Sequence, residues 1–317
     1  MPNLVKQIPE TMRKLGVSEE TMSQFDFPKT SQSDDVMIRF EKDSSDPAHN
    51  IFTNTMADMK WTDIQDYADK KAIVLLPIGV IEEHGPHLCL ATDIYTAHID
   101  CEAVKNYLER KGYPVIIAPP FYWGICQAAR GFIGSFNIRP ETAKNLMFDI
   151  LSSLKDFGFE TIFAVNAHGD IEHKITAMNA FKEACERLAI TACVPYDDFM
   201  LQHFGLGSDA DCFYSIKPQE IRVSEATVGD VHAGDIETAT INTFYPHLVD
   251  RQKAKELPDV PLGDNFESWM FGGQLKELSP QGYLGSPASY EDVDILKNVE
   301  DYAHRISEAI IERLNRN

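Results

Sequence analysis

Potential metal ligands gather directly after an apolar run in the first third of the chain. Residues 72–77 are continuously apolar, which is typical of a buried strand. Glu82 and His84 follow this run, and a turn at Gly85 returns the chain to Asp93. Glu82 and His84 share a face if the chain is extended, so they could bind one metal ion or two neighbouring ions. Carboxylates and imidazoles in this density favour Zn²⁺, Mn²⁺ or Fe²⁺, although a polar loop with hydrogen-bonded histidines is the alternative.

Two later segments repeat this pattern of metal-competent side chains at an element boundary. His168 and Asp170 follow the apolar run 161–165, although Asp170 could instead cap the helix that begins near it. His232 and Glu237 lie at the start of another helix, where His232 could simply be a capping residue. In open parallel sheets, ligands bind beyond the carboxyl ends of the strands. The first two segments are therefore expected to bring five ligands to a pair of metal ions, as two-metal hydrolysis requires.

The elements that must hold these residues alternate between strand and helix. Apolar runs of strand length occupy residues 72–77, 115–118, 161–165 and 190–195. Helical spacing of apolar residues, with proline or capping residues at starts and glycine at ends, predicts helices over residues 61–67, 97–108, 140–157, 172–188, 232–243 and 290–314. This alternation predicts an α/β fold with a mainly parallel sheet and helices on both faces. Residues 200–230 have no pattern from which an element can be predicted.

Composition and charge exclude several classes of function. The 317 residues carry a formal net charge of −20, which argues against binding to nucleic acid or to an anionic membrane surface. The chain starts without the apolar stretch of a secretory signal and contains no run long enough to span a bilayer. A cytoplasmic protein whose six cysteines are reduced thiols is therefore expected. Residues 1–54 are expected to form an N-terminal extension and residues 55–317 a single domain.

Four motifs, in order along the chain, resemble those of the creatininase (creatinine amidohydrolase) family. They are Glu82-Glu83-His84-Gly85-Pro86-His87-Leu88 with Thr92-Asp93, then Gly131-Phe132-Ile133-Gly134-Ser135, Asn166-Ala167-His168-Gly169-Asp170 and His232-Ala233-Gly234-Asp235-Ile236-Glu237-Thr238. The resemblance runs from about Trp61 to the C-terminal helix. It implies a creatininase-like three-layer sandwich that is often a homohexamer, so a homo-oligomer is expected.

The resemblance also implies two divalent metal ions per chain, which would be Zn, Mn or Fe. Glu82 and His168 would hold one ion, His84 and Asp170 would hold the other, and Asp93 would bridge both. A water bound between two such ions loses a proton near neutral pH. The resulting hydroxide would attack the carbonyl of a small cyclic or linear amide.

Three of the matched residues are implied to take part in catalysis. His232 would donate or accept a proton next to the substrate, and it is the candidate that protonates the leaving nitrogen. Asp170 would be either a ligand or a proton shuttle. Glu237 would be a further acid at the site, either a ligand or a residue that supports one.

The substrate is less well determined than the reaction. Creatininase is understood to enclose creatinine with tryptophans before its third motif, and residues 191–240 contain none. The family also includes enzymes that open cyclic amides, remove formyl groups or cleave small peptide-like intermediates. Phosphoester hydrolysis is disfavoured, because Arg130 and Arg139 are the only arginines near the glycine-rich motif. A metal-binding but inactive structural or regulatory protein is the alternative from another class.

Overall fold

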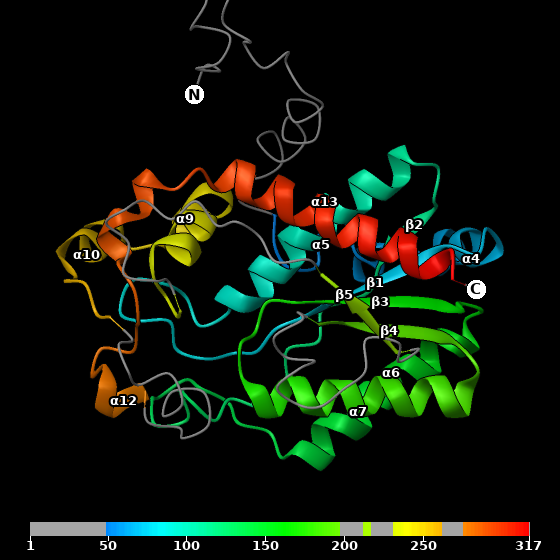
Figure 1. Cartoon of the computed structure of the whole chain (residues 1–317), viewed down its shortest axis with the longest axis horizontal. Helices are drawn as coiled ribbons and strands as arrows, with labels where there is room; N and C mark the ends of the chain where they lie inside the picture. Colours follow the sequence, from blue (N-terminus) through cyan, green and yellow to red (C-terminus); the bar gives the residue numbers. More distant parts are fainter. Residues whose placement is uncertain (1–48, 197–211, 217–230, 262–274, 317) are drawn as a thin grey trace, which may run out of the picture.

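The computed structural model describes residues 49–196, 212–216, 231–261 and 275–316 (Figure 1). Residues 1–48, most of the expected extension, lie outside the described residues, as does most of the unpatterned stretch 200–230. No helix within the described ranges is both long and apolar enough to cross a bilayer.

Five parallel strands form one sheet in the order β2-β1-β3-β4-β5 (Figure 1). They are β1 (Ile73–Ile78), β2 (Val115–Ile117), β3 (Thr161–Asn166), β4 (Thr191–Tyr196) and β5 (Phe213–Ser215). The first four lie where the apolar runs predict them. The fifth was not predicted, because it has only three residues and lies in a stretch without periodicity. The expected α/β fold with a parallel sheet is confirmed.

Helices cover both faces of the sheet, as predicted (Figure 1). The described helices are α4 (Trp61–Asp69), α5 (Thr92–Arg110), α6 (Pro140–Asp156), α7 (Ile171–Leu188), α9 (Asp235–Phe244), α10 (Arg251–Glu256), α12 (Leu275–Leu278) and α13 (Ile295–Leu314), with short 3-10 helices η1 (Met56–Asp58), η2 (Pro246–Leu248) and η4 (Pro287–Asp292). Alternate side chains of β1 enter two cores: Ile73 and Leu75 pack on the side of α5 and α13, and Val74 and Leu76 on the side of α6 and α7.

The last helix begins later than its periodicity predicts. It starts at Ile295 rather than near Tyr290, because Asp294 caps it by accepting a hydrogen bond of 3.3 Å from the Lys297 N–H. Tyr290 lies in η4, which precedes this cap.

The carboxyl ends of β1 and β3 lie side by side, with Ile78 paired with Asn166. The chain leaves β1 at Gly79, where a Cβ atom would lie 2.8 Å from the backbone of Asp93. Only glycine allows the start of α5 to approach the end of β1 this closely. The fold thereby places Asp93 against the loops that follow the two central strands.

Candidate metal centre

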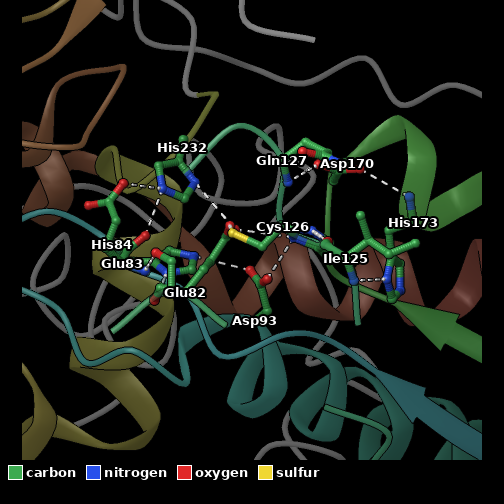
Figure 2. Close-up of polar contacts among 12 residues, drawn as sticks. Glu82, Glu83, His84, Asp93, Ile125, Cys126, Gln127, Asp170, His173 and His232 are labelled. Carbon is green, nitrogen blue, oxygen red and sulfur yellow. Dashed lines mark hydrogen bonds and ion pairs between the residues drawn. The ribbon is translucent and has the colours of Figure 1, made fainter. Parts of the chain in front are cut away.

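Six candidate side chains converge beyond the carboxyl ends of β1 and β3, and Figure 2 labels four of them, Glu82, His84, Asp93 and His232. Glu82 and His84 come from the loop after β1, Asp93 from the first turn of α5, and His168 from the loop after β3. Helix α9 begins at Asp235 with Gly234 as its N-cap, so Glu237 lies in its first turn, and His232 lies in the segment before it and is not the cap. Glu237 is partly exposed, and the other five are buried. Three segments that are distant in sequence therefore contribute to one site, two of them at strand ends and the third beside the start of a helix.

Asp93 lies at the centre of this arrangement. Its Oδ2 atom is 2.9 Å from His168 Nδ1, and its Oδ1 atom is 3.1 Å from His84 Nε2. Each carboxylate oxygen thus faces a different histidine. A carboxylate held in this way can bridge two cations, one on the side of each ring.

Two sets of donor atoms share Asp93. In the first set, donor atoms of Glu82, Asp93 and His168 lie within 4.8 Å of one another, with Glu82 Oε1 3.2 Å from His168 Nδ1. In the second set, His84 and Asp93 are joined by Glu237, whose Oε2 atom is 3.7 Å from His84 Nε2. Mixed oxygen and nitrogen donors of this kind suit first-row divalent metals.

Backbone carbonyl groups fix which nitrogen of each histidine faces the carboxylates. His168 donates from Nε2 to the Ile125 carbonyl at 2.9 Å, and His84 donates from Nδ1 to the Glu82 carbonyl at 3.1 Å. A carbonyl oxygen can only accept, so each neutral ring has its lone pair on the nitrogen that faces Asp93. Such a lone pair and a carboxylate oxygen are both acceptors and repel each other, so this arrangement is stable only with a cation or a proton between them. The donor set therefore fits a metal pair, with the orientation that metal-binding histidines usually have.

The electrostatics of the site also favour a bound positive charge. Burial by itself would lower the pKa of His168, but Glu82 and Asp93 raise it well above its ordinary value. Burial likewise opposes the rise in the pKa of His84, which Asp93, Glu237 and Glu82 cause. Burial disfavours ionised Glu82, yet the neighbouring His168 outweighs it and lowers the pKa of Glu82 to about 2. The carboxylates stay ionised and attract cations.

Asp170 lines the site but is held in another way. Its Oδ1 atom accepts from the His173 N–H at 3.0 Å, which caps α7, and its Oδ2 atom accepts from the Gln127 N–H at 2.7 Å. The capping role that the sequence allows is therefore present. Among the described residues, Asp170 is not one of the side chains whose donor atoms lie within 4.8 Å of one another.

Cys126 supports a candidate ligand in a way that the sequence did not indicate. Its thiol donates to Glu82 Oε2 at 2.7 Å (Figure 2), while Asn137 Oδ1 accepts from the Cys126 N–H at 2.9 Å. Burial and the adjacent Glu82 raise the pKa of this thiol far above its usual range, so it remains a hydrogen-bond donor. Glu82 is thereby fixed with its Oε1 atom toward His168.

His173 supports the site in a similar way, through Ile125, the residue before Cys126. Its Nδ1 atom accepts from the Ile125 N–H at 3.2 Å, and the carbonyl of the same residue orients His168. The His173 ring lies so close to Gly124 that a Cβ atom there would approach it to 2.4 Å. These contacts join residues 48 and 43 positions apart, so no local pattern could reveal them.

His232 is oriented by Glu83, which lies between the candidate ligands Glu82 and His84 in the sequence. Its Nε2 atom donates to the Glu83 carbonyl at 2.9 Å and lies 3.3 Å from Glu83 Oε1, while its Nδ1 atom is 3.9 Å from Glu82 Oε1. Burial and the nearby His84 act to lower the pKa of His232, but Glu83 and Glu82 raise it to about 9. Glu83 belongs to the first motif, yet its side chain was given no role from the sequence.

A cavity of about 110 Å³ opens over the centre. The ionisable residues that line it are Glu82, Asp93, His168, Asp170, His232 and Glu237. This volume corresponds to roughly three or four water molecules. The cavity can therefore admit a small polar group next to the candidate ligands.

Comparisons with known proteins agree with one another. A family model described as creatinine amidohydrolase matches residues 57–310. A mycofactocin precursor peptide peptidase from Mycobacterium ulcerans is 25% identical over 245 residues, which cover 74% of this chain and 84% of the relative. A creatinine amidohydrolase from Pseudomonas putida is 24% identical over 191 residues, or 59% of this chain and 69% of the relative. A solved structure described as "Creatininase Mn" matches with a TM-score of 0.58 and 19% identity, over 82% of this chain and 98% of that chain, which bears on the fold alone.

Proposed function

Because the chain belongs to the creatininase family, we propose that it hydrolyses the amide bond of a small cyclic or linear substrate with the help of two divalent metal ions. One observation carries the proposal. Asp93 presents one carboxylate oxygen to His168 and the other to His84, and both rings turn their lone pairs toward it.

We assign ligands to the two ions from this geometry. Glu82, Asp93 and His168 would hold one ion, and His84 and Asp93 would hold the other. When bound, the ions would supply Lewis acidity, which would polarise the substrate carbonyl and make water a nucleophile near neutral pH. Zn²⁺ and Mn²⁺ suit the donors, and one solved relative is described with Mn.

The protein's own groups complete the reaction. The nitrogen that leaves a cleaved amide must be protonated, and His232 is a cavity-lining imidazole that we do not assign to a metal. Its Nε2 proton is bound by Glu83, so Nδ1 is the atom that exchanges a proton with the substrate. Creatinine and peptide-like substrates, which the names of the relatives specify, both contain C–N bonds that this chemistry would break.

Metal removal tests the proposed function. We expect the purified protein to hydrolyse at least one member of a panel of creatinine, other cyclic amides, formamides and short peptides. Dialysis against a chelator should abolish that rate, and added Zn²⁺ or Mn²⁺ should restore it, because the nucleophilic water depends on the ions. A chelated protein that keeps its full rate would contradict the proposal. A metal-loaded protein that hydrolyses none of the panel would favour the inactive alternative.

The second ion needs a further carboxylate, and we propose that Glu237, whose donor atom lies within 4.8 Å of those of His84 and Asp93, supplies it, with Asp170, which lines the same cavity, as a further ligand. Glu237→Gln and Asp170→Asn should each weaken the binding of one ion by ~10-fold or more and spare the ion held by Glu82 and His168. Titration of chelated protein with Mn²⁺, followed by electron paramagnetic resonance, measures this effect. A variant that retains wild-type affinity at both positions would remove its residue from the ligand set.

A further inference from the structure

A second group of metal-competent side chains lies outside the candidate centre, at the N-terminal edge of the described chain. One ring nitrogen each from His49 and His98 and one carboxylate oxygen of Glu102 lie within 4.8 Å of one another. All three residues are buried, with exposed fractions of 8%, 0% and 7%. We propose that these residues bind an additional divalent ion, which fastens the segment before α4 to helix α5.

His98 is held in the same way as the two histidines of the candidate centre. Its Nε2 atom donates to the Thr53 carbonyl at 2.8 Å, which leaves the lone pair of the neutral ring on Nδ1. The Tyr245 hydroxyl donates to this lone pair at 3.3 Å, a long contact that a bound ion would replace. A backbone carbonyl that fixes one ring nitrogen and frees the other for a metal is the usual arrangement for a histidine ligand.

Glu102 and His49 complete the set from two different segments. Glu102 lies one turn after His98 on α5, so both side chains point to the same side of the helix. Asn54 donates to Glu102 Oε1 at 2.7 Å and fixes the carboxylate, while Glu102 Oε2 is 4.0 Å from His49 Nε2. Two imidazoles and one carboxylate form a donor set that suits Zn²⁺.

The additional site shares no ligand with the candidate centre. His98 is five residues after Asp93 on α5, which corresponds to roughly 7–8 Å along the helix and a rotation of about 140°. The ion would therefore act structurally, by joining residues 49–54 to α5 next to the point where Thr55 pairs with Ile117 at the edge of the sheet. This inference does not depend on the proposed function.

Zinc stoichiometry of the full chain tests the inference. We expect chelated wild-type protein to take up roughly three Zn²⁺ per chain, and Glu102→Gln to take up one fewer, because the amide keeps the contact with Asn54 but loses the charge. Glu109→Gln, an exposed change on the same helix, is the matched control and should bind as many ions as the wild type. Asp93→Asn should keep one ion, and adding Glu102→Gln to it should remove that ion.

The outcomes separate this site from the catalytic proposal. If the candidate centre held no metal, the wild type would bind a single ion that Glu102→Gln removes. The inference is overturned if Glu102→Gln and the wild type bind the same number of ions. If Glu102→Gln does not fold, His49→Gln takes its place in the same measurement. An Asp93→Asn variant that binds no zinc would also overturn the inference.

Discussion

Asp93→Asn is expected to remove both metal ions from the candidate centre and to reduce amide hydrolysis by at least roughly 10³-fold, the equivalent of several kcal/mol of metal-assisted stabilisation. The side chain faces His168 with one oxygen and His84 with the other, so this single change affects both donor sets. An amide offers one oxygen and a nitrogen that cannot bind a cation. Elemental analysis and rate measurements on the same preparation would show both effects.

Asp100→Asn is the matched control for this variant. Asp100 is a buried carboxyl group on the same helix, and burial raises its pKa to about 8 against the opposing influence of Arg305. The group is therefore mostly protonated at neutral pH, and an amide resembles it closely. We expect Asp100→Asn to retain both ions and the full rate. Full metal occupancy in Asp93→Asn would show that Asp93 does not bridge the ions.

His232→Gln is expected to keep both ions but to lower kcat by ~10²–10⁴-fold, the usual contribution of a positioned acid or base. Glutamine can hydrogen-bond to Glu83 but cannot transfer a proton at neutral pH. Because His232 is not assigned to a metal, the Michaelis constant should change much less than kcat. Steady-state kinetics with parallel elemental analysis distinguishes a proton-transfer role from a ligand role.

His304→Gln provides the matched histidine change, because His304 is exposed on α13 and is not among the residues that line the cavity. We expect His304→Gln to have the same kcat as the wild type. A His232→Gln variant that loses an ion would place His232 among the ligands. An unchanged kcat would instead identify His232 as a structural residue, held by its hydrogen bond to the Glu83 carbonyl.

Much of the fold follows from local patterns. β1, β3 and β4 are short apolar runs, and α6 has proline at its first residue, so their positions could be predicted from neighbouring residues alone. The positions of β5 and of the start of α13 could not be predicted in this way. β5 depends on pairing with β4 rather than on its own sequence, and α13 starts where Asp294 caps it.

The candidate site could also be predicted only in part from the sequence. Strand ends predicted that Glu82, His84, Asp93 and His168 would lie together, since parallel strands end at one edge of the sheet. The contacts that orient these side chains could not be predicted. Cys126 reaches Glu82 across 44 positions, and only the folded chain brings them together. Asp170 illustrates the limit, because a helix cap and a metal ligand have the same local signature.

The most direct test of the metal pair is a crystal structure of the metal-loaded protein with anomalous diffraction measured at the Zn or Mn absorption edge. We predict two anomalous peaks roughly 3.5–4 Å apart, one on each side of the Asp93 carboxylate. One peak should contact Glu82 and His168, and the other should contact His84. A single peak, or none beside Asp93, would contradict the two-ion centre on which the proposed function rests.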